Sequence, residues 1–192
     1  MSTAAVHAGM KALAFLFAAI LLMTPVLQAA AASAKTIHQI RDDIKAANDR
    51  DGSGHYEAII PYLADKIETL HEPRFPNDGF IEGKRLAKSL PIEHKMHDAM
   101  LENRKFDVTF TVRGENEIVV KGNMTGILRH DGKPLVHPVN IVWTFDKGKL
   151  VRIWVDASNP HIKEGYQRQG EAMKSEAVRP LYEQMIKAMQ EP

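Results

Sequence analysis

The feature that most constrains this chain is an alternation of apolar and polar residues that recurs in four segments between residues 106 and 156. In the first segment the apolar residues occupy every second position, as in a half-buried strand: Phe106, Val108, Phe110 and Val112. Three more strands are predicted at 118–128, 135–145 and 150–156. The turns between them are too short for a crossover connection, so the four strands are predicted to form an antiparallel meander.

Helical periodicity is found on both sides of this meander. Before it, the sequence predicts helices at 36–48, near 55–63 and in two pieces that meet at Pro91, with a short strand at 66–71 and a loop at 73–83. After Pro160 it predicts two helices divided at Pro180. This order predicts an α+β fold, namely a curved antiparallel sheet with N-terminal helices forming a cone (a cystatin-like roll), plus extra C-terminal helices.

The N-terminal segment 1–34 differs from the rest of the chain. It has one strongly charged residue, Lys11, an apolar run, and a small-residue end at Ala32-Ser33-Ala34. This layout predicts a secretory signal peptide cleaved near Ala34–Lys35, and a periplasmic or secreted protein. The alternative is an uncleaved membrane anchor. The predicted domains are therefore the signal peptide at 1–34, a cone domain at 35–160 and a C-terminal helical extension at 161–192.

Composition excludes several classes of protein. The chain has no Cys, which excludes disulfide scaffolds, thiolate metal sites and thiol nucleophiles. Without 1–34, Lys and Arg balance Asp and Glu, so binding to nucleic acid is not expected. A membrane contact is expected only through an uncleaved signal segment.

Several short segments together resemble the nuclear transport factor two-like superfamily, in particular its SnoaL-like branch. The resemblance covers residues 37–160, and the segments that carry it are Tyr62–Pro73, Gly79–Gly83, Val120–Gly126, Trp143–Arg152 and Trp154–Asp156. It implies a cone that encloses a small, largely apolar molecule, and related cyclases, isomerases and hydrolases use an Asp in such a cone. No cofactor is predicted.

Asp156 is the leading catalytic candidate. Strict alternation would place it on one strand face with Trp154, Arg152 and Leu150. A carboxyl next to an indole in an apolar pocket would lose solvation, so its pKa would rise towards that of a general base. The alternative is an exposed Asp that ends the strand and caps the turn at 158–160.

Two histidines are further candidates. His71 ends the first strand, where its imidazole could exchange a proton near neutral pH, or could simply contact solvent at the rim. His137 is in phase with the apolar residues of its strand, so it is expected inside the cone or at a buried interface, as a ligand contact or as a structural residue. The other predicted ligand-binding residues are aromatic: Trp154, Trp143, Tyr62 and Phe80.

No metal site is predicted. His94 and His97 are three residues apart on one helix, but no further ligand is visible beside them. The segment 49–60 matches the start of a calcium-binding EF-hand loop, but Ile60 occupies the position of the required bidentate Glu.

Three functions therefore remain open. The first is an exported binding or accessory protein for a small, largely apolar ligand, acting as a homodimer through the outer face of the sheet. The second is an isomerase, cyclase or hydrolase that uses Asp156 and His71. The third is an assembly module that binds a partner through its C-terminal helices. Whether the protein is an enzyme is left undecided.

Overall fold

A computed structural model describes residues 35–51, 55–72 and 78–190 of the chain. The predicted signal peptide and Gly52–Gly54 of the EF-hand-like loop lie outside these residues. The chain from Lys35 onward forms one compact unit. Within the described residues, no helix is both long enough and apolar enough to span a lipid bilayer.

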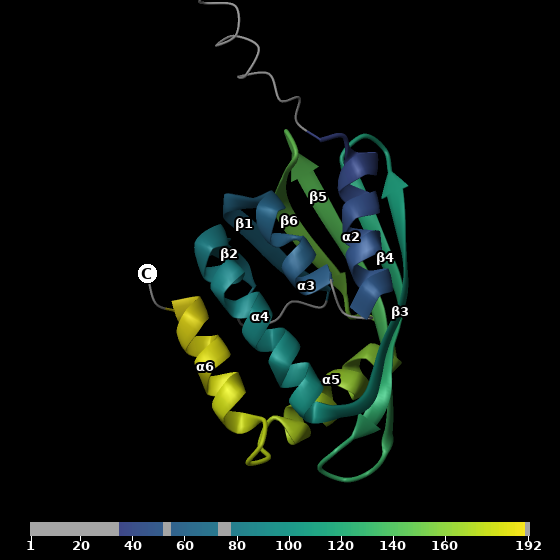
Figure 1. Cartoon of the computed structure of the whole chain (residues 1–192), viewed down its shortest axis with the longest axis vertical. Coiled ribbons are helices and arrows are strands. Elements are labelled where there is room, and N and C mark those ends of the chain that lie inside the picture. The colour runs from purple at the N-terminus through teal and green to yellow at the C-terminus, as the bar shows by residue number, and fades with distance from the viewer. Residues whose placement is uncertain (1–34, 52–54, 73–77, 191–192) are drawn as a thin grey trace, which may run out of the picture. The chain divides into compact units, whose positions relative to one another are not determined.

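The described chain is α+β, as predicted, and is built around a curved, unclosed sheet (Figure 1). The six strands lie in the order β2-β1-β6-β5-β4-β3. Their bounds are β1 Leu63–Glu72, β2 Gly79–Glu82, β3 Leu101–Arg113, β4 Glu117–Leu128, β5 Pro134–Asp146 and β6 Lys149–Asp156. The meander β3-β4-β5-β6 is confirmed, and β1 joins it parallel to β6.

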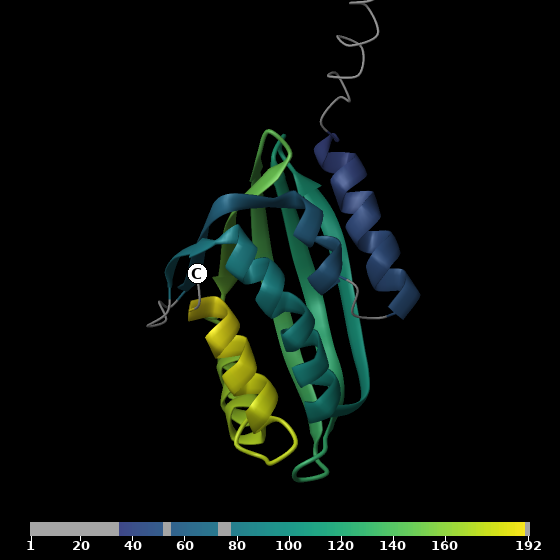
Figure 2. The same ribbon diagram turned by 60° about the vertical axis from the view of Figure 1, so that its left-hand side comes forward.

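The helices are α2 Ile37–Asp51, α3 His55–Ala58, α4 Gly83–Met100, α5 Pro160–Ala172 and α6 Arg179–Gln190, with a 3-10 turn at Ile60–Tyr62. Helices α2, α4 and α5 pack on the sheet, whereas α6 packs on α4. Figure 2 shows α4 and α6 side by side on one side of the strands. The core is a single cluster that joins α2, α4 and the inner face of the sheet, with Ile44, Ile67, Met96, Ile118 and Leu150 among its fully buried residues.

Two local predictions about the first half of the chain are wrong. Gly83–Met100 is one continuous helix, with Pro91 inside it, rather than two short helices. The predicted loop at 73–83 contains β2, which pairs antiparallel with β1. In both cases packing against neighbouring elements outweighs the local Pro and Gly signals.

Two irregularities shape the strands. In β3, the pairing with β4 shifts between Glu102 and Lys105, so two residues lie opposite Gly126, and Asn103 there has a positive φ of 52°. In β6, the pairing with β5 shifts at Thr144/Phe145, so Val151 is an extra residue. Such bulges bend a strand and re-aim the side chains beyond them.

Candidate functional site

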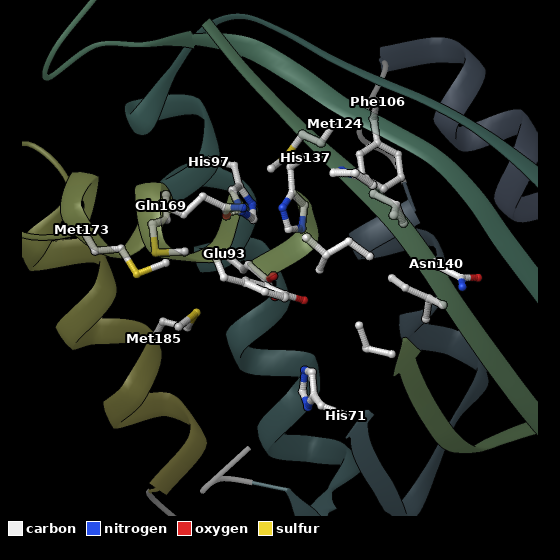
Figure 3. A pocket seen from close by; sticks show the side chains of 17 residues that line it. His71, Glu93, His97, Phe106, Met124, His137, Asn140, Gln169, Met173 and Met185 are labelled. Atoms are coloured by element: carbon white, nitrogen blue, oxygen red, sulfur yellow. Dashed lines mark hydrogen bonds between the residues drawn. The ribbon is translucent and has the colours of Figure 1, made fainter. Parts of the chain in front are cut away.

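A cavity of about 350 Å³ lies between the inner face of the sheet and helices α4, α5 and α6 (Figure 3). Its wall is largely apolar and includes four methionines from four different segments: Met96, Met124, Met173 and Met185. A volume of this size is within the usual range for small-molecule sites. The polar lining residues come from β1, α4, β5 and α5.

Glu93 supplies the carboxyl group of the cavity. It projects from α4 one turn before His97. Within the described residues its carboxyl has no hydrogen-bond or ion-pair partner, and the half-buried residue lines the cavity. Because burial disfavours the charged form, the pKa of Glu93 rises to about 7. This group can therefore be protonated or ionised at neutral pH.

His97 and Gln169 connect α4 to α5. The His97 Nε2 and Gln169 Oε1 atoms are 3.3 Å apart, and both side chains are buried. Burial, with a smaller contribution from the nearby Arg104 charge, lowers the pKa of His97 to about 4, so its imidazole is neutral at pH 7. Gln169 Nε2 has no hydrogen-bond partner within the described chain. It is thus a buried donor beside the cavity.

His137 lies on β5 and is 7% exposed. Its ring packs edge-on against Tyr166 of α5, with centroids 4.8 Å apart. Gly165 permits this approach, because a Cβ at that position would lie 2.1 Å from His137 Nδ1. Burial lowers the pKa of His137 to about 4, and burial together with the Glu93 charge raises the pKa of Tyr166 to about 12. Both groups are therefore neutral at pH 7.

Figure 3 shows the labelled side chains of Glu93, His97, His137 and Gln169 converging in one part of the cavity, with His71 apart from them. His71 lines the cavity and is held by Asp78. The His71 Nδ1 and Asp78 Oδ1 atoms are 2.5 Å apart, and the His71 backbone N–H donates to Asp78 Oδ2 at 2.9 Å. His71 is therefore an oriented imidazole in the wall, rather than a loose rim residue.

Asp156, in contrast, does not line the cavity. Its carboxylate accepts hydrogen bonds from the Ser158 side chain and backbone and from Asn140 Nδ2. These bonds, those from Ser158 first, lower the pKa of Asp156 below its usual value. The expected desolvated Asp with a raised pKa is wrong, and the alternative of a carboxylate that caps the turn at the strand end is the arrangement found.

The bulge at Val151 explains this outcome. Leu150 lies opposite Phe145, on the inner face of the sheet. One extra residue then reverses the alternation, so that Ile153 and Val155 lie opposite the inward residues Trp143 and Ile141. Arg152, Trp154 and Asp156 consequently lie on the outer face. In Figure 3 the Asn140 amide, which bonds Asp156, points away from the polar residues of the cavity.

The aromatic candidates are also placed elsewhere, since none of the four lines this cavity. Trp143 is buried in the core against Phe110. Tyr62 donates a hydrogen bond to Asp43 of α2. Phe80 is 67% exposed, with the Lys66 ammonium over its ring, and Trp154 lies on the outer face of β6.

The structure groups no three or more potential metal ligands within its described residues. His94 faces Glu57 and Asp98, with nitrogen–oxygen distances of 3.8 and 3.5 Å, whereas His97 faces Gln169. The two histidines therefore do not converge.

Sequence reasoning missed Glu93 and Tyr166. A usable signal was present for Glu93, because it stands four residues before His97 and three before Met96, and those three side chains share a helix face. For Tyr166, nothing in the local sequence predicts that its helix covers the cavity.

No family model matches the chain, and no curated protein matches it. Solved structures are similar in fold. An NTF2-like protein from Burkholderia thailandensis has a TM-score of 0.48 and 21% identity, covering 69% of this chain and 98% of the other. A proposed polyketide cyclase from Acidithiobacillus ferrooxidans has a TM-score of 0.48 and 21% identity, covering 72% and 99%.

A proposed SnoaL-like polyketide cyclase from Mesorhizobium loti has a TM-score of 0.44 and 16% identity, covering 63% of this chain and 98% of the other. These neighbours are NTF2-like proteins and proposed SnoaL-like cyclases, in agreement with the resemblance predicted from the sequence. At these values the likeness concerns the fold alone and carries no information about activity.

Proposed function

We propose that this protein binds a small, largely apolar molecule in the cavity between the sheet and helices α4, α5 and α6. The observation that carries the proposal is the cavity itself, about 350 Å³ in volume and lined mainly by apolar side chains. An apolar ligand that leaves water for such a wall gains free energy in proportion to the area that it buries.

The polar groups in the wall support binding of a ligand that carries one polar group. Gln169 Nε2 is a buried donor without a partner, and Glu93 is a half-buried carboxyl that lines the cavity. Buried polar groups that stay unsatisfied cost free energy, so a ligand that satisfies them binds more tightly and in one orientation.

An enzyme that uses Asp156 as its base is not supported by this geometry, because the Asp156 carboxylate lies outside the cavity and is held in its ionised form. The assembly function is also weakened. It required an apolar C-terminal helix without packing partners, whereas Leu181 and Met185 of α6 pack against the core and Met185 lines the cavity.

The test is a binding titration with the neutral fluorescent probe N-phenyl-1-naphthylamine, whose emission rises in apolar surroundings. The wild-type protein should bind it saturably. Val155→Trp, which fills the cavity from β6, should abolish binding. Val136→Trp is the matched control, since Val136 is exposed and lies on the outer face of β5. Equal binding by both variants would remove the cavity from the proposal.

Export belongs to the same proposal, supported by the charge and hydropathy pattern of residues 1–34. The chain expressed in a Gram-negative host should be recovered from the periplasm with Lys35 as its first residue, as intact mass measurement would show. A protein that retains residues 1–34 in the membrane fraction would instead support the anchor.

A homodimer through the outer face of the sheet is also proposed. That face carries apolar side chains from neighbouring strands, including the half-buried Trp154 and the exposed Val136, together with the Arg152–Glu68 ion pair. Sedimentation should give twice the monomer mass, and Trp154→Glu should return the protein to a monomer. A monomeric wild-type protein at micromolar concentration would refute the homodimer.

A further inference from the structure

The ligand class of the cavity can be inferred from the sign of its charges. Among the residues that line it, Glu93 is the one carboxyl, and no Lys or Arg is present. The imidazoles of His97 and His137 are neutral because their pKa values lie at about 4. The third imidazole of the wall, His71, is paired through its Nδ1 with the Asp78 carboxylate. The described wall therefore has a carboxyl group and no Lys, Arg or unpaired imidazolium to compensate its charge.

The other titratable groups of the described cavity wall come from four elements. They are Tyr166 from α5, His137 from β5, His97 from the same helix as Glu93, and His71 from β1, which lies apart from the other three. Arg104, whose charge acts on His97, does not line the cavity and is bonded to Asp98 at 2.7 Å. Thus no residue of the described wall is placed to neutralise an ionised Glu93.

We propose that Glu93 is the counter-ion for a protonated amine, so that the cavity binds a small, largely apolar amine with its nitrogen beside this carboxyl. The inference rests on the binding function proposed above and gives it a ligand class. A buried carboxylate without a partner is unfavourable, and a cationic ligand removes that cost directly. An anionic ligand would add a second buried negative charge without a partner.

The rest of the wall suits an organic cation. The rings of Phe106 and Tyr166 present electron-rich faces, and the thioethers of the four lining methionines are polarisable. The cation lowers the pKa of Glu93, so binding near pH 7 should release part of a proton from this carboxyl. The amine itself stays protonated at that pH, because its ordinary pKa is about 10.

The experiment compares three probes of one shape by calorimetric titration of the full chain: 2-aminoindane, 2-indanol and indane-2-carboxylate. The wild-type protein should bind the amine about tenfold or more tightly than the alcohol, and the carboxylate most weakly. Its affinity for the amine should rise between about pH 6 and about pH 8, roughly one unit either side of the Glu93 pKa of about 7, as this carboxyl ionises.

Glu93→Gln should reduce the affinity for the amine by about tenfold or more and remove its pH dependence, while binding of 2-indanol stays within about threefold. Binding of 2-indanol also shows that the variant is folded. Asp156→Asn is the matched control, because it neutralises a carboxylate outside the cavity and should leave binding of the amine unchanged.

Each other result contradicts the proposal. If the amine and the alcohol bind equally, if Glu93→Gln leaves binding of the amine intact, or if the carboxylate binds best, Glu93 is not a counter-ion, although the cavity still binds apolar ligands. If none of the three probes binds and N-phenyl-1-naphthylamine does not bind either, both the proposed binding function and its ligand class are refuted.

Discussion

Two carboxyl groups on opposite sides of the sheet have pKa values shifted in opposite directions. On the inner side, the Glu93 carboxyl lies in an apolar cavity and its pKa rises to about 7. On the outer side, the Asp156 carboxylate is held by Ser158 and Asn140, and its pKa falls below the usual value. The surroundings of a carboxyl group therefore decide whether it can exchange a proton near neutral pH. The position of Asp156 at the end of a strand that resembles a family motif does not make it such a group.

The largest expected effect tests this contrast through stability. Between pH 4.5 and pH 7 the folded protein keeps a proton on Glu93 that the unfolded chain releases, so raising the pH favours unfolding. Glu93→Gln should therefore gain stability relative to wild type over this range, by up to about 3 kcal/mol, and then level off. The free energy of unfolding of both proteins, measured in urea at a series of pH values, gives this difference in stability.

Asp156→Asn should show the opposite sign. Because the folded pKa of Asp156 lies below 3.8, the carboxylate stabilises the native state above that pH, and the contribution is lost as the pH falls through the folded pKa. The variant should lose about 1 kcal/mol at pH 7 and little at pH 3. If the stability difference from wild type changed with pH in the same direction for both variants, the two carboxyl groups would not differ in the predicted way.

The next effect concerns the fit between α5 and the inner face. Gly165→Ala places a Cβ 2.1 Å from His137 Nδ1, so the imidazole must move, and the variant should lose about 2 kcal/mol of stability and bind the apolar probe more weakly. Gly170→Ala, in the same helix with nothing near its Cβ, should instead gain about 0.5–1 kcal/mol. Equal losses in chemical denaturation would mean that helix propensity, rather than the His137 contact, is being measured.

The smallest expected effect concerns the rate at which a ligand leaves the cavity past helix α6. Met185→Ala removes a cavity-lining side chain and should speed release of the bound probe, with a stability loss of about 1 kcal/mol. Gln184→Ala, on the exposed side of the same helix, should change neither quantity. Stopped-flow dissociation gives the release rates, and identical rates would show that the ligand leaves by another route.

The four-strand meander could be predicted because each strand alternates cleanly and each turn is short. Orientation within a strand was harder. The sequence from Leu150 to Asp156 contains no Gly or Pro that indicates a bulge at Val151, and the bulge becomes visible only through pairing with β5. One extra residue reverses every side chain beyond it, which moved Asp156 and Trp154 to the outer face.

The continuity of α4 across Pro91 also depended on information that is not local. Pro91 lacks a backbone N–H, so a break in the helix was the reasonable expectation, yet α4 continues because it is packed against β1, β3 and α6. His71 and His137 both line the cavity, while their roles there stay predictions. Helix α5, which brings Tyr166 and Gln169 to the cavity, reaches it only through the tertiary fold.

The four thioethers in the cavity wall give this site a chemical weakness that its aliphatic residues do not share. Oxidation of Met96, Met124, Met173 or Met185 to the sulfoxide would place a strong dipole in the wall and make the space less suited to an apolar guest. The chain has no cysteine that could react with the oxidant first. Exposure to peroxide would therefore reduce ligand binding gradually, and a methionine sulfoxide reductase would restore it.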